Sequence, residues 1–376
     1  MQKEFFGVGA IQNLEKLLKE YNPKKIFLVC GKKSFYLSGA SEKIKPLIKH
    51  IPHIVFNPTP NPKIEEIKRG IALFRNFKPD LIIAVGGGSV IDSAKSINTL
   101  AFQNDDPLLY IKGQKEVKNQ GKPLIAIPTT AGTGSEATKF ATIYINKKKY
   151  SLETEKNIPD AAIVDPTFTY SLNPYLTACN GLDALCQGIE SYWSTNSNEK
   201  SRDYAKKAIK LAFNHIEKAV KDPDRKARLA MAEAANLSGK AINITKTTAC
   251  HSVSYPLTSY FGIPHGHAVA LTVPSFLEFN SEVREEDCND KRGVKFVRKR
   301  LNEIFSILTV KNGKEAKERF EALLGNILEK TKLRDFNISK EDLELLLKES
   351  FTPSRMNNNP RKVTRENLKK ILENIW

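Results

Sequence analysis

Residues 81–101 read LIIAVGGGSVIDSAKSINTLA, and this stretch decides the fold. Its five apolar residues predict a buried strand, its three glycines predict a turn that other backbone can approach closely, and Ser89 predicts the cap of a helix with one apolar face. A helix that starts directly after a strand offers unpaired N–H groups and a positive dipole end to an anion, as in sheets that hold a dinucleotide pyrophosphate. The turn lacks the usual GxGxxG pattern, so a glycine turn that serves packing alone is the alternative.

The flanking residues continue the alternation of strands and helices. KKIFLVC (24–30) and HIVF (53–56) are apolar runs that predict buried parallel strands, and PKIEEIKRGIALFRNF (62–77) has its apolar residues at helical spacing. The order predicts a doubly wound, mostly parallel, Rossmann-like sheet with helices on both faces. After the apolar PLIAIP (123–128), the loop TTAGTGSE (129–136) interleaves hydroxyl groups with glycines and suits a ribose or a nicotinamide amide. A loop that only turns the chain is the alternative.

A change of pattern near residue 173 predicts a domain boundary. ATIYIN (141–146) and AAIVD (161–165) still favour strands, and the Pro-punctuated DPTFTYSLNPY (165–175) follows them. Beyond it the periods are helical to the end of the chain. We therefore predict an α/β domain over residues 1–173 and an all-helical domain over residues 174–376.

Composition excludes several classes of protein. The five cysteines are scattered without a CxxC pair, which favours reduced, mostly buried thiols. No apolar run approaches the length of a membrane span and no signal-peptide pattern opens the chain, so we expect a cytoplasmic protein with no membrane contact. The net charge of +17 comes without an arginine-rich arm, so we expect no nucleic-acid partner, and attraction of small anions is favoured. The lysines that contribute to this charge are spread over predicted solvated helix faces; examples are Lys200, Lys206, Lys207 and Lys210.

Three of the six histidines lie in HSVSYPLTSYFGIPHGH, residues 251–267. The first two, His251 and His265, are fourteen residues apart and can meet across one helical segment and a following loop, where imidazoles bind a metal or move a proton. Asp183 and Gln187 leave one face of a predicted helix. Together the four side chains suit Fe(II) or Zn(II). The alternative is a group of unrelated polar residues near a Pro/Gly turn.

Six segments in order resemble the iron-containing (group III) alcohol dehydrogenase family over essentially the whole chain. They are FGVGAIQNL, GGGSVIDSAK, IPTTAGTGSE, GLDAL followed by GIE, the spaced histidines with IPHGHA, and NNNPRKVT. The resemblance implies a dehydroquinate synthase-like architecture, with residues 1–173 as the dinucleotide-binding domain and residues 174–376 as the metal and substrate domain. It also implies a cleft between them and nicotinamide-dependent reduction of a carbonyl.

The resemblance also implies the cofactor contacts. The matching positions are Asn61, Gly87, Gly88, Ser89, Asp92, Thr130, Thr133 and Lys149. Where NAD-preferring members carry an acidic residue after the second strand, this chain has Gly31 followed by Lys32 and Lys33. The missing carboxylate and the added charge favour a 2′-phosphate, so NADPH is expected as well as NADH.

The metal site departs from the family pattern. Family ligands are one Asp and three His; Asp183, His251 and His265 match, but Gln187 stands at the second position. A further family histidine is Tyr255 here. An amide oxygen binds these ions less tightly than imidazole, so the site either holds Fe(II) or Zn(II) more weakly or has been abandoned.

The segments around these departures are most similar to the phosphonoacetaldehyde reductase branch of the family. That similarity implies reduction of phosphonoacetaldehyde, a small anionic aldehyde, to 2-hydroxyethylphosphonate. Such a substrate needs cations, and the candidates are Lys139, Lys246 and Arg355. Without a metal, Lys246, Tyr255 or His267 must stabilise and protonate the product oxygen, although His267 is equally a packed group beside the site.

Two alternatives stay open at the level of sequence. One is a metal-dependent dehydrogenase of another small alcohol, diol or hydroxy acid. The other is a non-catalytic descendant that binds nucleotide or nucleic acid. A homo-oligomer is compatible with every one of these interpretations.

Overall fold

Strand β4 (Leu81–Gly86) and helix α5 (Gly88–Ala101) form the centre of the N-terminal unit in the computed structural model, which describes residues 2–376. The chain divides into two units, Met1–Leu172 and Asn173–Trp376. All six strands of the main sheet run parallel, in the order β1-β8-β5-β4-β2-β3. The other five strands are β1 (Lys3–Phe6), β2 (Ile26–Cys30), β3 (His53–Phe56), β5 (Leu124–Pro128) and β8 (Ala161–Val164). The predicted doubly wound α/β fold is confirmed.

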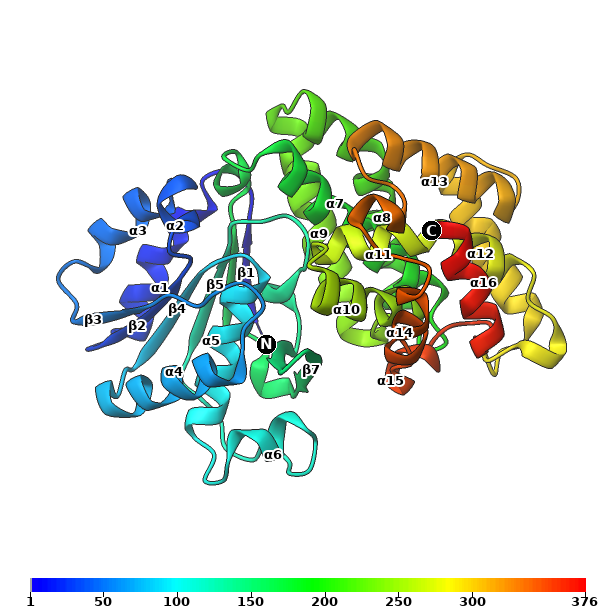
Figure 1. Cartoon of the computed structure of the whole chain (residues 1–376). Helices are drawn as coiled ribbons and strands as arrows, with labels where there is room; N and C mark the ends of the chain where they lie inside the picture. The colour runs from blue at the N-terminus through cyan, green and yellow to red at the C-terminus, as the bar shows by residue number, and fades with distance from the viewer. Residues whose placement is uncertain (1) are drawn as a thin grey trace. The chain divides into compact units, whose positions relative to one another are not determined.

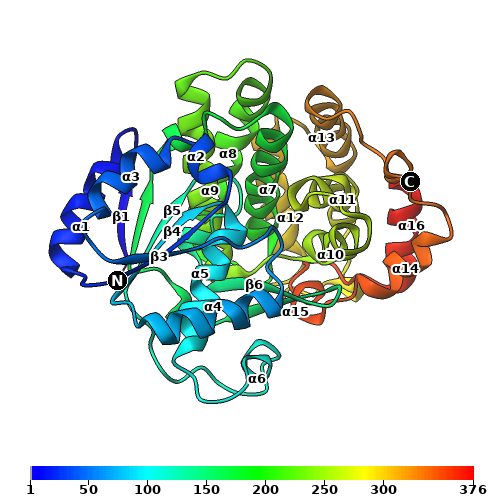
Figure 2. The same cartoon turned by 60° about the vertical axis from the view of Figure 1, so that its left-hand side comes forward.

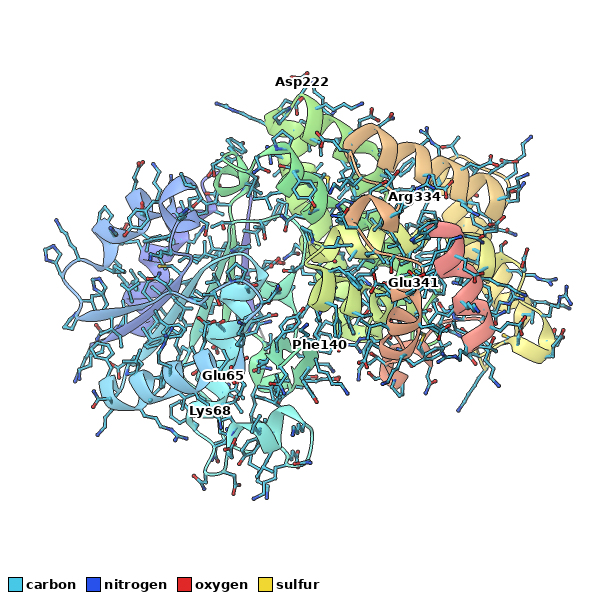
Figure 3. The ribbon with its side chains drawn as sticks, in the orientation of Figure 1. Glu65, Lys68, Phe140, Asp222, Arg334 and Glu341 are labelled. Carbon is cyan, nitrogen blue, oxygen red and sulfur yellow. The ribbon has the colours of Figure 1, made fainter. Side chains whose placement is uncertain are left out.

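Helices cover both faces of this sheet (Figure 1). One face packs against α1 (Asn13–Tyr21), α2 (Ser34–Leu37) and α3 (Ala40–Ile48). The other packs against α4 (Ile64–Phe77), α5 and α6 (Pro107–Ile111). Strands β2 and β4 are therefore buried along their whole length, as central parallel strands are. Polar side chains such as Glu65 and Lys68 project from the outer side of α4 (Figure 3).

The chain reverses its direction across the sheet between β2 and β4. It passes from β2 outward to the edge strand β3 and then crosses back to β4 on the other side of β2. Gly31 follows β2 and Gly87 follows β4, and the Gly31 N–H donates to the carbonyl of Val85 at 3.3 Å. Ligands of open α/β sheets bind at such a reversal, outside the carboxyl ends of the strands.

Two sequence predictions in this unit were wrong in detail. HIVF is not a buried strand: β3 lies at the sheet edge with one neighbour, and Val55 is 51% exposed. Ser89 does not cap α5, because Gly87 occupies the N-cap in an extended conformation and Ser89 falls in the first turn. The strand predicted for ATIYIN is present as β6 (Phe140–Ile145), which pairs in a separate antiparallel hairpin with β7 (Lys148–Glu153).

The C-terminal unit is built from helices. They are α7 (Pro174–Trp193), α8 (Glu199–Lys221), α9 (Arg225–Thr245), α10 (Ala249–Phe261), α11 (His265–Ser281), α12 (Val294–Leu308), α13 (Gly313–Ile327), α14 (Asp342–Glu349), α15 (Pro353–Met356) and α16 (Arg365–Ile375). Asn173, Asn198 and Asp224 cap the starts of α7, α8 and α9. Helix α7 is buried along most of its length and packs against α8, α9 and α11 (Figure 2).

Two further expectations from composition can be compared with the structure. Four of the five cysteines are buried, as predicted, and none of them forms a disulfide within residues 2–376. Lys200, Lys206, Lys207 and Lys210 are exposed along α8, also as predicted. None of the helices described here combines the length and the apolar character needed to cross a membrane.

Helices α7 and α11 approach most closely at Gly266. A Cβ at this position would lie 1.9 Å from the carbonyl oxygen of Cys179 and 2.9 Å from the Cβ of Asp183. The first of these atoms is backbone and cannot rotate away. The absence of a side chain at Gly266 therefore lets α11 start directly against the middle of α7.

We expect Gly266→Ala to lower the free energy of unfolding by about 1–3 kcal/mol or more, because the helices must move apart to admit the methyl group. Urea unfolding measures the effect. The matched control is Gly325→Ala in α13, where a Cβ has open space around it and should add about 0.5–1 kcal/mol through helix propensity. Equal stability of the two variants would contradict this account of the α7–α11 contact.

Candidate active site

Asp183, His251 and His265 come together inside the C-terminal unit. One ligand atom from each lies within 4.8 Å of the others. The two imidazole centroids are 5.3 Å apart, and Nε2 of His251 is 3.4 Å from Oδ1 of Asp183. The two histidines thus meet across α10 and the following loop, as their spacing predicts. We name these three residues the Asp–His–His cluster.

Glu190 orients the first histidine of this cluster. Its side chain is completely buried, and it accepts hydrogen bonds from Nδ1 and the backbone N–H of His251 and from the backbone N–H and hydroxyl of Thr248. A carboxylate only accepts, so Nδ1 of His251 carries the hydrogen and Nε2 points toward Asp183. A carboxylate behind an imidazole in this way fixes the tautomer that binds a metal through Nε2.

Sequence reasoning missed Glu190, although the signal was present. In GLDALCQGIE, Glu190 follows Asp183 by seven residues, which is two helical turns and therefore the same face of α7. The sequence prediction extended only to Gln187, one turn from Asp183.

The electrostatics of the cluster call for a positive charge. Burial alone would lower the pKa of His251, but the negative charges of Glu190 and Asp183 raise it to about 9. Burial likewise would raise the pKa of Glu190, yet His251 and the hydrogen bonds hold it below its usual value. Two buried carboxylates around one imidazole favour a positive charge, either a second proton on His251 or a bound cation, and Nε2 of His251 has no hydrogen bond within the described chain. A divalent ion fits both requirements.

Gln187 lies one turn along α7 from Asp183, as predicted, and is buried. Its amide oxygen accepts a hydrogen bond from Ser238 of α9 at 3.0 Å. An amide oxygen has two lone pairs, so the bond from Ser238 does not by itself prevent this oxygen from binding a metal ion as well. Gln187 therefore keeps the capacity to act as a weak fourth ligand, with Ser238 fixing its orientation.

Tyr255 and Arg355 adjoin the cluster. The Tyr255 ring stacks on the His265 imidazole, with centroids 6.2 Å apart and planes at 27°. Nε of Arg355 donates to the Tyr255 hydroxyl at 3.3 Å. A guanidinium from α15 is thus linked to the cluster through Tyr255, and it is partly exposed to solvent.

Both ring nitrogens of His267 form hydrogen bonds inside the C-terminal unit. Nε2 lies 2.8 Å from the carbonyl of Lys330, which only accepts, so Nε2 carries the hydrogen. Nδ1 then accepts from the hydroxyl of Tyr175 at 3.1 Å. Burial lowers the pKa of His267, which holds it neutral. The side chain is 1% exposed, and these contacts favour the packed alternative over the proton carrier.

Lys246 has an unusual backbone. It ends α9 with φ 60° and ψ 177°, a conformation that residues other than glycine rarely adopt. Asn358 donates to the carbonyls on either side of it, those of Thr245 and Thr247. The neighbouring Thr248 is bonded to Glu190. The strained residue is therefore tied through a few bonds to the carboxylate that holds His251.

The predicted cofactor residues gather around the glycine turn of the N-terminal unit. A Cβ on Gly87 would lie 3.2 Å from Thr130, and one on Gly88 would lie 2.8 Å from Thr133. The Asn61 N–H donates to the Ser89 hydroxyl at 3.2 Å. No side chain caps α5, and the N–H groups of Val90 and Ile91 donate to the carbonyl of Gly87, so the helix start offers the N–H groups of Gly88 and Ser89 at a position of the kind that binds anions.

The remaining predicted residues differ in their surroundings. The carboxylate of Asp92 accepts from the Ser135 hydroxyl at 2.5 Å and the Thr142 N–H at 2.9 Å, so it binds the loop rather than presenting itself to a ligand. Lys149 lies on β7 opposite Tyr144. The ammonium of Lys139 pairs with Glu155 at 3.0 Å and Glu153 at 3.7 Å, which offsets the charge that a phosphonate would need.

Comparison with known proteins agrees with this geometry. Residues 2–166 match the family model described as iron-containing alcohol dehydrogenase, and residues 177–376 match the one described as Fe-containing alcohol dehydrogenase family, C-terminal. The chain is 35% identical over 309 residues to a phosphonoacetaldehyde reductase of Streptomyces viridochromogenes, covering 79% of this chain and 76% of that protein. It is 30% identical over 383 residues to alcohol dehydrogenase 4 of Saccharomyces cerevisiae, covering 99% and 96%.

A solved structure is similar along the whole chain. The sulfoacetaldehyde reductase from Bifidobacterium kashiwanohense in complex with NAD+ has a TM-score of 0.88 and 29% sequence identity, and the match covers 100% of this chain and 96% of that one.

Glu190→Gln tests the orienting carboxylate. We expect affinity for Fe(II) or Zn(II) to fall about 10- to 100-fold, because a neutral amide neither offsets the cation nor holds His251 as firmly. Competition with a chromophoric chelator measures it. Glu199→Gln, at an exposed position in the first turn of α8, is the control. Unchanged metal affinity in a folded Glu190 variant would separate this carboxylate from the cluster.

Proposed function

This chain belongs to the iron-containing alcohol dehydrogenase family and is an NAD(P)-dependent oxidoreductase of alcohols and aldehydes, and on that premise we propose that it reduces phosphonoacetaldehyde to 2-hydroxyethylphosphonate. The observation that carries the proposal is Arg355, whose guanidinium adjoins the Asp–His–His cluster through Tyr255. Its charge is what an aldehyde with a nearby anionic group requires. A neutral aldehyde would have no use for it.

The two ends of the proposed substrate would lie on the two sides of Tyr255. In phosphonoacetaldehyde a single methylene separates the carbonyl carbon from the phosphorus. We place the phosphonate on Arg355, whose planar fork can donate two parallel hydrogen bonds to it, and the carbonyl toward His251 and His265. Because Tyr255 lies between the guanidinium and the imidazoles, its ring sets the spacing of the two ends.

Lys246 is the second cation that we assign to the substrate. Strained backbone persists where the surrounding structure enforces it, and it concentrates at functional sites. Asn358 enforces it here by holding both flanking carbonyls. We assign Lys139 no role, because Glu153 and Glu155 already pair with it.

Asp183, His251 and His265 would hold a divalent cation, with Gln187 as a weak fourth ligand. A cation bound there supplies Lewis-acid polarisation of the carbonyl oxygen, and NAD(P)H supplies the hydride. Glu190 keeps Nε2 of His251 directed at the ion. Three strong protein ligands leave room for the substrate oxygen, which is the arrangement of catalytic rather than structural sites.

The dinucleotide would bind at the sheet reversal between β2 and β4. The first turn of α5 would hold the pyrophosphate, with Thr130 and Thr133 beside Gly87 and Gly88. Gly31 at the end of β2 brings no carboxylate to the ribose, and Lys32 and Lys33 follow it. We therefore propose that NADPH is used at least as well as NADH.

The reaction balances with these groups. Hydride transfer to the carbonyl carbon leaves an alkoxide, which must take up one proton. We assign that proton to the Tyr255 hydroxyl, since Arg355 donates to its oxygen and its own hydrogen can pass to another acceptor. Solvent then replaces the proton on Tyr255.

Arg355→Gln should lower kcat/KM for phosphonoacetaldehyde about 10- to 100-fold or more, because it removes charge-assisted hydrogen bonds to the phosphonate, and leave propanal nearly unaffected. Steady-state assays with NADPH and with NADH measure both aldehydes. Arg355→Lys should recover part of the activity, and Arg334→Gln, at an exposed arginine, should change nothing. Sulfoacetaldehyde belongs in the same panel, because a sulfonate carries one negative charge where a phosphonate carries up to two.

Two results would count against the proposal. Equal loss on phosphonoacetaldehyde and propanal would mean that Arg355 supports the fold rather than the anion. A preference of the wild-type enzyme for sulfoacetaldehyde or for a neutral aldehyde would move the assignment to that substrate.

A further inference from the structure

One lysine in the centre of the N-terminal unit is completely buried. Lys95 lies on α5, and its ammonium contacts oxygens of three residues in the segment that follows β5. It donates to the carbonyls of Ser135, Thr138 at 2.7 Å and Phe140 at 3.0 Å, and it lies 3.2 Å from the hydroxyls of Ser135 and Thr138. Phe140 opens the β6–β7 hairpin (Figure 3).

The donor count fixes the state of this group. Three carbonyl oxygens can only accept, and an ammonium has three hydrogens to give, so the protonated lysine satisfies all three. A neutral amine has two hydrogens and a lone pair, so one of the three carbonyls would lose its bond to Lys95, although the carbonyl of Ser135 would keep the Thr138 N–H as a donor. The full set of contacts seen here therefore favours the protonated Lys95.

The same loop reaches the glycine turn at its other end. The Ser135 N–H donates to the Thr133 hydroxyl at 3.2 Å, and Thr133 is the residue that a Cβ on Gly88 would meet at 2.8 Å. Asp92, one turn before Lys95 on α5, holds the Ser135 hydroxyl and the Thr142 N–H. Lys95 and Asp92 together thus fasten the segment from Thr133 to Thr142 onto the helix whose start would receive the pyrophosphate.

We propose that Lys95 is a positioning residue for the dinucleotide: its buried ammonium holds the loop after β5 against the start of α5, so that cofactor affinity depends on the proton that Lys95 carries. The proposal rests on the assignment of the glycine turn to NAD(P)(H), and it concerns cofactor binding alone. It does not depend on which aldehyde is reduced.

Burial brings the loss of the Lys95 proton into a pH range in which cofactor binding can be measured. It lowers the pKa of Lys95 to about 8, against the smaller opposing effects of Asp92 and the buried Glu136, which are the charges that face the ammonium. We therefore expect the Kd for NADP+ to rise about tenfold between pH 7 and pH 10, as one carbonyl loses its donor and the loop loosens.

The direction in which folding stability changes with pH distinguishes a loosened loop from an unfolded protein. The pKa of Lys95 is lower in the folded chain than in the unfolded chain. The buried lysine therefore destabilises the folded state less as the pH rises from about 8 toward the ordinary pKa of a lysine. Loss of the Lys95 proton therefore does not by itself lower the melting temperature over this range. Weaker binding at an undiminished melting temperature is the predicted combination.

Titration of NADP+ binding without aldehyde, at fixed ionic strength and at several pH values, makes the measurement by tryptophan fluorescence or calorimetry. Lys95→Met should bind weakly at all pH values, with the alkaline rise in Kd removed. Lys68→Met, an exposed lysine on α4, should behave as wild type (Figure 3).

Two outcomes would overturn the proposal. One is a wild-type Kd that stays constant from pH 7 to pH 10, and this titration needs no variant to fold. The other is a Lys95→Met protein that shows the wild-type alkaline rise, which would assign the titration to a different group. Neither outcome bears on the choice of aldehyde, whereas failure of the wild-type protein to bind NADP+ and NAD+ at all would instead remove the proposed function.

Discussion

The buried contact between Glu190 and His251 is the constraint on which the C-terminal unit depends. A carboxylate cannot be buried without a partner, and this one receives hydrogen bonds from the start of α10 through His251 and Thr248. Those bonds fix where α10 begins relative to α7. Gly266 fixes α11 against the same stretch of α7, so that His265 and Asp183 are brought to the same place. The contacts that pack α7, α10 and α11 together therefore also bring Asp183, His251 and His265 together.

A comparable device operates in the N-terminal unit, with the charges reversed. There a buried ammonium, Lys95, is the group that must be satisfied, and the carbonyls of the loop after β5 satisfy it. In both units a buried ion on a central helix specifies the position of a polar loop that hydrophobic packing alone would leave undetermined. In both cases the ordered loop adjoins the atoms that we assign to chemistry, the imidazoles in one unit and the glycine turn in the other.

The sequence predicted the parts of the structure that follow from short-range patterns. Periodicity placed β2, β4, β5 and the helices, and the fourteen-residue spacing predicted that His251 and His265 meet. It failed where the outcome depends on which neighbours an element acquires. HIVF has the apolar residues of a central strand but became an edge strand. Lys95 looks like a solvated lysine of GGGSVIDSAK until the fold surrounds it with carbonyls, and Glu190 is significant only because α10 places Thr248 and His251 against it.

The central claim is that the Asp–His–His cluster holds a divalent cation on which aldehyde reduction depends, although Gln187 stands where the family pattern has a histidine. The most direct test is to remove metal with a strong chelator, dialyse, and measure metal content and phosphonoacetaldehyde reduction on the same samples. The account predicts that activity falls in proportion to bound metal and returns when Fe(II) or Zn(II) is added back. A metal-free enzyme that reduces the aldehyde at an undiminished rate would contradict it.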